Sequence, residues 1–218
     1  SSATGVDAIS AVEGDVTIIE GIDVTSDGVG AALAASALAG VEIDVIVHNA
    51  GGIAMDTSAA GGAVMGTQSF TNVTPEIMLG AFQLNTLGPL RVQQALDGQL
   101  KSPGGKIAII STGMGSIGDN GSGGLYAYRT SKAAVNMVMK NMSVDHKDRG
   151  IAVVAVNPGM VVTNFGPGSE ALANFGAMPV ETSAQGLITV FDDLTIETTG
   201  SYMNVKKDGP PQVFGPGW

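Results

Sequence analysis

The two side chains with the clearest chemical potential are Tyr128 and Lys132, which lie four residues apart in a stretch of helical periodicity. At this spacing both side chains lie on one face of a helix. An ammonium group beside a phenol favours the phenolate, so we expect Lys132 to lower the pKa of Tyr128 from about 10 toward neutral pH. Such a tyrosine can donate a proton to a carbonyl oxygen or accept one from an alcohol. The spacing alone arises by chance in roughly one such chain in ten, and the alternative is an ordinary solvated helix face.

The composition excludes several other kinds of chemistry. The 218 residues include no Cys and two His, so we expect no disulfides, no thiolate site and no metal centre; His48 is expected to be a hydrogen-bonded residue at a strand end. Twenty Asp and Glu against ten Lys and Arg give a net charge of −10, which disfavours nucleic acid and anionic membranes as partners. No apolar run approaches the roughly 18 residues of a membrane span, so we expect a soluble protein of the cytoplasm or an organelle.

The elements that would position Tyr128 and Lys132 alternate between short β-branched runs and longer helical stretches. This alternation is typical of a parallel α/β fold, and with 44% apolar residues the chain 1–218 suits a single domain. Strands are predicted at 16–24, 41–47, 106–110, 151–156 and 202–205, and helices at 28–39, 75–98, 124–149 and 181–194. Thr74 is the expected N-cap of the second helix and Gly150 the residue that ends the third. The Gly-rich segments 51–73 and 164–180 are predicted to be loops, the first of them mobile.

A series of motifs in chain order carries a family resemblance. The motifs are Asp23-Val24-Thr25, Asn49-Ala50-Gly51, Asn85-Thr86-Leu87-Gly88-Pro89, 110–117, 126–132 and 157–163. Together they resemble the short-chain dehydrogenase/reductase family, with the closest likeness to its sniffer and C-factor-like carbonyl reductase branch. The likeness extends over nearly the whole chain. It implies a Rossmann-like doubly wound parallel sheet and a reaction that interconverts a small carbonyl compound and its alcohol.

The resemblance also implies roles for individual residues. Tyr128 would be the acid/base, and Lys132 would lower its pKa and hold the nicotinamide ribose. Asn85 would hold a water that links Lys132 to solvent; its alternative role is a polar kink in the helix.

The substrate-orienting serine of the family is replaced in this chain. Thr112 occupies its position, and it keeps the hydroxyl donor while adding a methyl group, which we expect to tighten the pocket. Ser111 and Ser116 are the alternatives, and Ser116 has the spacing that is more usual in the wider family.

NAD(P) is the implied cofactor, with NADP slightly favoured by analogy. Asp23 and Val24 would contact the adenine. The other implied contacts are Asn49, Ala50 and Gly51 at the adenosine ribose and Pro158, Gly159, Val161 and Thr163 at the nicotinamide carboxamide.

The sequence departs from the family at its start. The segment Gly28-Val29-Gly30 follows a predicted strand, but Leu33 stands where the phosphate-binding fingerprint needs its third glycine. The later motifs assign the 16–24 run to the third strand of the family fold, so the first βαβ unit is missing from this sequence. We therefore expect the native protein to have upstream residues. Without them, 16–24 would pair directly with 41–47 and NAD(P) would bind poorly.

Two function hypotheses follow. The first is an NAD(P)-dependent carbonyl reductase or dehydrogenase whose loops 51–73 and 164–180 shape a pocket for an uncharged substrate, the second loop acting as a lid. The other is a catalytically silent structural or nucleotide-sensing subunit of an assembly. The missing fingerprint and Thr112 favour the silent subunit, whereas the set of Asn85, Tyr128 and Lys132 favours the enzyme. By analogy, copies of the chain would pair through the helices 75–98 and 124–149.

Overall fold

The computed structural model describes residues 12, 14–53, 66–215 and 218 of the chain. Their strands form one sheet in the order β1-β2-β3-β4-β5. The strands are β1 (Val45–His48), β2 (Lys106–Ile110), β3 (Ala152–Asn157), β4 (Ser201–Asn204) and β5 (Gln212–Val213). The first four are parallel, and β5 runs antiparallel to β4. This is the Rossmann-like parallel sheet that the resemblance implies.

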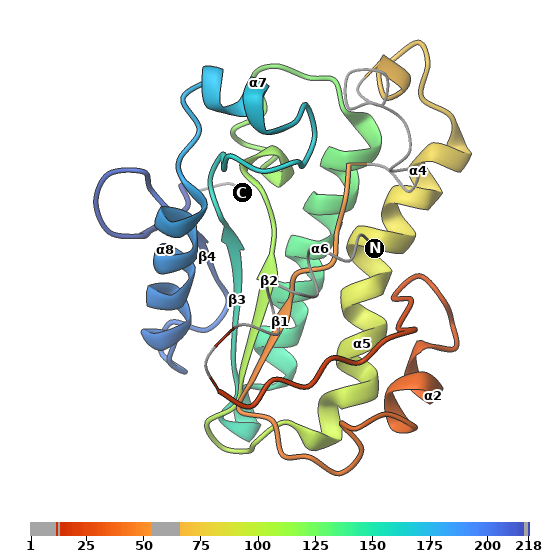
Figure 1. Cartoon of the computed structure of the whole chain (residues 1–218), viewed down its shortest axis with the longest axis vertical. Helices are drawn as coiled ribbons and strands as arrows, with labels where there is room; N and C mark the ends of the chain where they lie inside the picture. Colours follow the sequence, from red (N-terminus) through yellow and green to blue (C-terminus); the bar gives the residue numbers. More distant parts are fainter. Residues whose placement is uncertain (1–11, 13, 54–65, 216–217) are drawn as a thin grey trace.

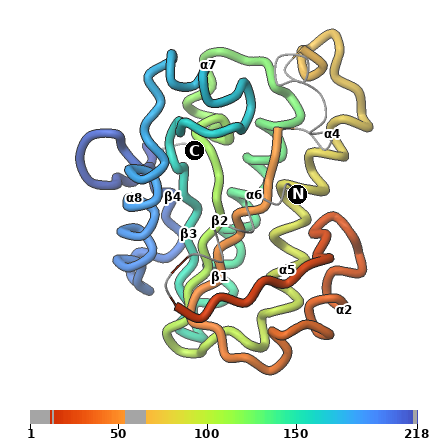
Figure 2. The backbone as a smooth tube through the Cα atoms, viewed as in Figure 1, coloured from red at the N-terminus to blue at the C-terminus, as the bar shows by residue number. Residues whose placement is uncertain are grey.

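Helices cover both faces of this sheet. They are α2 (Val29–Ala34), α4 (Pro75–Phe82), α5 (Gly88–Leu96), α6 (Tyr126–Asp145), α7 (Ser169–Asn174) and α8 (Val180–Asp192). Figure 1 shows the strands between α8 on one side and α4, α5 and α6 on the other. The backbone trace in Figure 2 shows α7 beyond the upper ends of the strands. In the described part of the chain, no helix is both long and apolar enough to cross a bilayer.

The central strand β3 explains how the two layers are held together. Its residues alternate between two apolar clusters: Val153 packs with residues of α5 and α6, and Val154 packs with residues of α8. Both residues are fully buried. A strand that is buried on both faces reads as a continuous apolar run, which is why 151–156 was recognisable as a strand.

The two long predicted helices are present, and one of them is interrupted. Thr74 Oγ1 accepts from the Ile77 amide at 3.4 Å, as expected of the N-cap. After α4 the backbone widens into a π-helical segment, Gln83–Leu87, before α5 begins. The third predicted helix is α6 followed by a 3₁₀ turn, and Gly150 ends it with a φ of +67°.

The predicted strand 16–24 is wrong. This segment has no strand structure, and within the described residues β1 pairs only with β2. A strand is defined by hydrogen bonds to a neighbour, so an apolar β-branched run without a paired neighbour does not become one. The segment is anchored by side chains instead: Ile22 packs against the core, and Val24 contacts Gly88 at the start of α5.

Three other predictions differ from the structure in their bounds or type. Helix α2 ends well before residue 39, and the Ser36 hydroxyl donates to Leu33 O at 2.7 Å, a local bond that competes with helix continuation. The predicted loop 164–180 contains α7, and β5 lies beyond residue 205, where no element is predicted. Most of the predicted loop 51–73 lies outside the described residues.

Candidate active site

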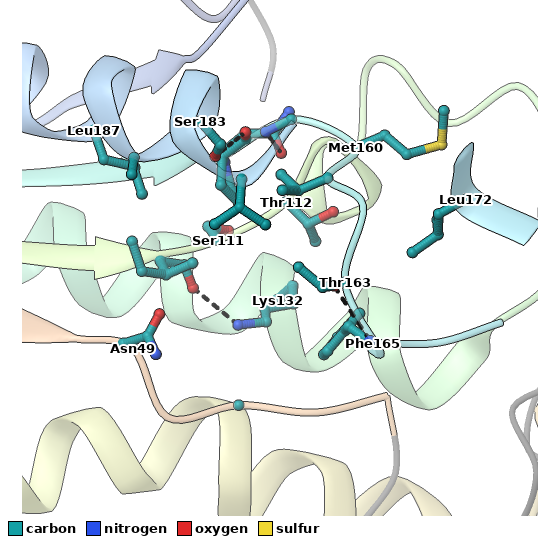
Figure 3. Close-up of a pocket in the computed structure, with 18 of the residues that line it drawn as sticks. Asn49, Ser111, Thr112, Lys132, Met160, Thr163, Phe165, Leu172, Ser183 and Leu187 are labelled. Atoms are coloured by element: carbon teal, nitrogen blue, oxygen red, sulfur yellow. Dashed lines mark hydrogen bonds between the residues drawn. The ribbon is translucent and has the colours of Figure 1, made fainter. Parts of the chain in front are cut away.

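A pocket of about 500 Å³ opens at the carboxyl ends of β1, β2 and β3. Ligands of open parallel α/β sheets bind at this edge. Its walls come from the segments that follow these strands, from one face of α6, and from α7 and α8 (Figure 3). The sequence-predicted residues that line it are Asn49, Gly51, Thr112, Tyr128, Lys132, Pro158, Gly159, Val161 and Thr163.

Helix α6 brings Tyr128 and Lys132 into this pocket together. Their exposed fractions are 6% and 5%. Lys132 Nζ donates to Ile110 O at the end of β2, at 2.9 Å, and Figure 3 shows this bond beside Asn49. The ammonium group is therefore anchored to the sheet, one helical turn from the phenol.

Burial shifts the pKa of both groups against their charged forms. Burial raises the pKa of Tyr128 to about 12, although a hydrogen bond with the Thr112 hydroxyl lowers it in part. Burial also lowers the pKa of Lys132 to about 8. The expected lowering of the Tyr128 pKa is thus wrong for this pocket, because removing water from the phenolate outweighs the hydrogen bond with Thr112.

Thr112 lies at the end of β2, beside the phenol. Its Oγ1 accepts from the Met114 amide at 3.3 Å and so begins the 3₁₀ turn Gly113–Gly115. Of the two alternatives, Ser111 also lines the pocket, but its hydroxyl donates to Asn136 Oδ1 at 2.6 Å. Ser116 is buried outside the pocket lining and accepts from the Asp119 amide. Thr112 and Ser111 therefore line the pocket and Ser116 does not, and the role of Thr112 as the orienting hydroxyl stays a prediction.

Asn85 lies in the π-helical segment and is fully buried. Its Oδ1 accepts from the Gly52 amide at 3.0 Å, and its Nδ2 donates to Gly52 O at 2.9 Å and to Ser131 Oγ at 3.0 Å. Asn85 therefore ties the segment after β1 to α6. The water that the resemblance assigns to it stays a prediction.

Gly51 passes through a narrow space between Asn85 and Lys132. A Cβ at this position would lie 3.0 Å from Asn85 Oδ1 and 3.2 Å from Lys132 Nζ. We expect Gly51→Ala to lower the free energy of unfolding by about 1–3 kcal/mol, because the neighbours must move to admit the methyl group. Urea denaturation measures this loss. Gly98→Ala is the matched control, since a Cβ there meets nothing within 4 Å; equal effects of the two changes would contradict the close fit at Gly51.

The segment after β3 is held by several hydrogen bonds. Asn157 Nδ2 donates to Asn204 Oδ1 at 2.9 Å, and its Oδ1 accepts from the Gly159 amide at 3.2 Å. Gly159 has a φ of +82°, which favours glycine at this turn. Ser183 of α8 donates to Pro158 O at 2.8 Å. This wall of the pocket is therefore a fixed turn of backbone.

Three predicted cofactor contacts lie outside the pocket lining. Asp23 accepts from the Thr25 amide and hydroxyl at 2.9 and 2.7 Å, and the hydroxyl contributes most to lowering the pKa of Asp23. Val24 packs on Gly88, and Ala50 is exposed between two residues that do line the pocket. The expectation for His48 is confirmed, since its Nε2 lies 3.0 Å from Gln93 Oε1.

Gln68 is a residue of this site that sequence reasoning missed. It is fully buried, its Nε2 donates to Ile53 O at 2.6 Å, and its Oε1 accepts from the Tyr128 amide at 2.9 Å. Helix α6 needs this bond because its own N-cap, Leu125, has no side chain that can accept. No periodic or capping pattern marks Gln68, because the amide groups that it satisfies lie about 60 positions further along the chain.

Removing the amide of Gln68 should leave the first turn of α6 unsatisfied. We expect Gln68→Leu to lower the free energy of unfolding by about 1–2 kcal/mol, the usual cost of a lost helix cap. Denaturation curves of the variant and of Gln94→Leu, an exposed glutamine on α5, provide the comparison. A Gln68 variant as stable as the Gln94 variant would show that α6 does not depend on this cap.

Comparison with protein families and curated sequences identifies similar proteins. A family model described as short chain dehydrogenase matches residues 2–171. The 1-hydroxy-2-glutathionyl-2-methyl-3-butene dehydrogenase of Rhodococcus sp. (strain AD45) is 36% identical over 193 residues, which cover 87% of this chain and 77% of that protein. The C-signal protein of Myxococcus xanthus is 34% identical over 163 residues, covering 74% of this chain and 88% of that protein.

Solved structures share the fold as well. The NADPH-bound carbonyl reductase from chicken fatty liver superposes with a TM-score of 0.78 at 26% identity, over 97% of this chain and 82% of that chain. The carbonyl reductase Sniffer of D. melanogaster gives a TM-score of 0.67 at 28% identity, over 88% of this chain and 76% of that chain.

Proposed function

The chain belongs to the short-chain dehydrogenase family of NAD(P)-dependent oxidoreductases, and from this premise we propose that it reduces a small carbonyl compound to its alcohol, with Tyr128 as the acid. One observation carries the proposal: the Tyr128 phenol, the Lys132 ammonium and the Thr112 hydroxyl meet in a single pocket at the carboxyl ends of the strands. A purely structural role does not require these three groups to meet in one pocket.

The residues of the pocket fit the nicotinamide end of the cofactor. Lys132 Nζ lines the pocket, where it suits ribose hydroxyls, and the fixed turn of Pro158 and Gly159 presents backbone groups, which suit a carboxamide. Val161 and Thr163 would complete this contact. NADP is favoured because solved relatives hold it, such as the chicken carbonyl reductase and a short-chain dehydrogenase/reductase of Burkholderia multivorans. The adenine contacts of Asp23 and Val24 remain predictions.

The protein's own groups would perform the proton transfer. When bound, a nicotinamide dinucleotide would be the source of the hydride that the carbonyl carbon receives. Thr112 Oγ would donate a hydrogen bond to the carbonyl oxygen, and Tyr128 would give that oxygen its proton. Because the pKa of Tyr128 is raised to about 12, the phenol is protonated at neutral pH, which supports the reducing direction. Lys132, with a pKa of about 8, is mostly cationic there and stabilises the phenolate that remains.

The pocket favours an uncharged substrate. Among the described residues that line it, Lys132 is the only one with a charged side chain. Met160, Phe165, Leu172 and Leu187 make the outer walls (Figure 3), and the Phe165 ring lies 6.2 Å from that of Tyr128. Phe165 and Leu172 belong to the 164–180 segment, which supports its proposed role as a lid over the substrate.

Association of two copies through the helices over 75–98 and 124–149 is part of the proposal. Helices α4 and α6 pack together, and exposed apolar side chains on them support an interface: Leu79, Met137 and Val144. Light scattering of the purified chain tests it, since a monomer at all concentrations would exclude this pairing.

A catalytically silent, nucleotide-sensing subunit is the second candidate. The replacement of the family's orienting serine by Thr112 favours it. The test is a fluorescence titration with NADPH followed by a panel of aldehydes and ketones. The proposal expects binding and substrate-dependent oxidation of NADPH. Binding without turnover on any uncharged carbonyl compound would favour the silent subunit, and the absence of both would overturn each candidate.

A further inference from the structure

Three aromatic side chains form a cluster behind the candidate active site. Tyr202 of β4 stacks on Phe214, with ring centroids 4.5 Å apart and an angle of 11° between the planes. Trp218 meets Tyr202 edge-on at 5.5 Å. Tyr202 is fully buried, and the pocket lining includes none of the three. We call Tyr202, Phe214 and Trp218 the aromatic cluster.

The C-terminal segment brings two members of the cluster into place. Strand β5 pairs with β4 through Met203 and Val213, and the Phe214 amide then donates to Tyr202 O at 2.6 Å. Figure 1 shows the C-terminus returning toward the strands rather than leaving the molecule. Phe214 is therefore held next to Tyr202 by backbone bonds as well as by ring stacking.

Two members of the aromatic cluster lie next to the segment Ser111–Gly113. The Tyr202 hydroxyl lies close to the Ser111 hydroxyl and to the backbone of Thr112. The Phe214 ring lies 3.6 Å from the point where Gly113 would carry a Cβ. The turn that carries the Thr112 hydroxyl thus lies next to the aromatic cluster.

The buried Tyr202 hydroxyl lowers the stability of the fold. In the described part of the chain it makes no hydrogen bond of regular geometry, and a buried hydroxyl without one costs stability that phenylalanine would avoid. Burial raises the pKa of Tyr202. Weak hydrogen bonds with Ser111 and the Thr112 backbone lower this pKa, whereas the charge of an ionised Tyr128 raises it.

We propose that the aromatic cluster is a positioning device, in which Tyr202 and Phe214 hold the Thr112 hydroxyl beside Tyr128 without touching substrate. The inference rests on the proposed function, since it assigns these residues a part in that reaction. It makes the C-terminal segment a determinant of the rate of carbonyl reduction.

The first test removes one oxygen atom. Tyr202→Phe keeps the ring stack, and we expect kcat to fall about 10-fold while the KM for NADPH is unchanged, because a small displacement of an orienting group slows the chemical step. Phe214→Leu should act in the same way, and Phe214→Tyr should restore the rate. Val213→Ala, at an exposed neighbour in β5, is the matched control and should leave the rate unchanged.

The second test asks whether the effect passes through Thr112. In a Thr112→Val background, Tyr202→Phe should cause no further loss of kcat, because residues that act through one group are not additive. Full additivity, or an unchanged kcat for Tyr202→Phe in the wild-type background, would overturn the proposal.

A third readout does not depend on turnover. The Gly115 amide donates to Thr112 O at 2.8 Å, and the Ser116 amide donates to Gly113 O at 3.1 Å, so hydrogen exchange of these amides reports on the turn. Tyr202→Phe should speed their exchange about 10-fold without changing exchange in the core strands. If the protein turns over no carbonyl compound but Tyr202→Phe speeds the exchange of these amides, the proposed function is contradicted and the positioning role is supported. Unchanged exchange contradicts the positioning role itself.

Discussion

Tyr128→Phe should reduce the rate of carbonyl reduction by about 10²–10⁴-fold, the usual contribution of a positioned acid. The change removes only the hydroxyl, and the ring remains packed against Phe165. Affinity for NADPH should therefore stay within about twofold of the wild type, since the acid acts on the substrate oxygen. Steady-state kinetics for kcat and a fluorescence titration for NADPH separate the two quantities.

The matched control for this change is Tyr126→Phe. Tyr126 lies on the same helix but is 39% exposed and contacts Phe70 instead of the pocket. Its variant should retain the wild-type rate. A Tyr128 variant with more than about a tenth of the wild-type rate would show that another group or a solvent water supplies the proton.

Lys132→Met should make the protein more stable at neutral pH and change how its stability depends on pH. Lys132 titrates near 10.5 in the unfolded chain but at about 8 in the fold, because burial penalises its charge. Below pH 8 both states hold the proton, and the folded state bears the full cost of the buried ammonium. Between about pH 8 and 10.5 the unfolded chain binds more protons, so the free energy of unfolding rises with pH.

Tyr128 sets the upper end of this rise. Its pKa is about 12 in the fold and 10.0 in the unfolded chain, so above pH 10 the unfolded chain loses its proton first and stability falls. The Tm of the wild-type protein should therefore gain roughly 5 °C between pH 7 and pH 10 relative to Lys132→Met, since 1 kcal/mol corresponds to about 2–4 °C in a chain of this size. Lys140→Met, an exposed lysine of α6, controls for general charge effects. If Tm depends on pH in the same way in the wild type and in Lys132→Met, the inference that burial lowers the pKa of Lys132 is wrong.

A Lys132→Met variant that is more stable than the wild type would show that Lys132 lowers the stability of the fold. Its buried side chain donates to Ile110 O, and methionine would fill a similar space without a charge. A variant that is more stable and less active is the pattern expected where a site is built for chemistry at the expense of the fold.

The features that the sequence determined by itself are those encoded within a few residues. The helical spacing of Tyr128 and Lys132 places both in one pocket, the Thr74 hydroxyl caps α4, and Gly150 ends the turn after α6. The buried run of β3 and the order of the motifs identify the parallel sheet and the family. Periodicity, caps and turns depend on neighbours along the chain, so they can be recognised without coordinates.

The remaining features depend on contacts between distant parts of the chain. The 16–24 run has the composition of a strand, but it has no paired neighbour among the described residues and so forms none. Gln68 caps a helix that begins nearly 60 positions later, and Tyr202 of β4 stacks on Phe214, which follows β5.

Burial decided the electrostatics of the site in the same way. A lysine one turn from a tyrosine predicts an acidic phenol, yet in the folded pocket the pKa of Tyr128 rises, because water is excluded by walls that no short stretch of sequence contains. The local sequence pattern thus determined that Tyr128 and Lys132 share a helix face. Only the tertiary structure determined their hydrogen-bond partners and their burial, which set their pKa values.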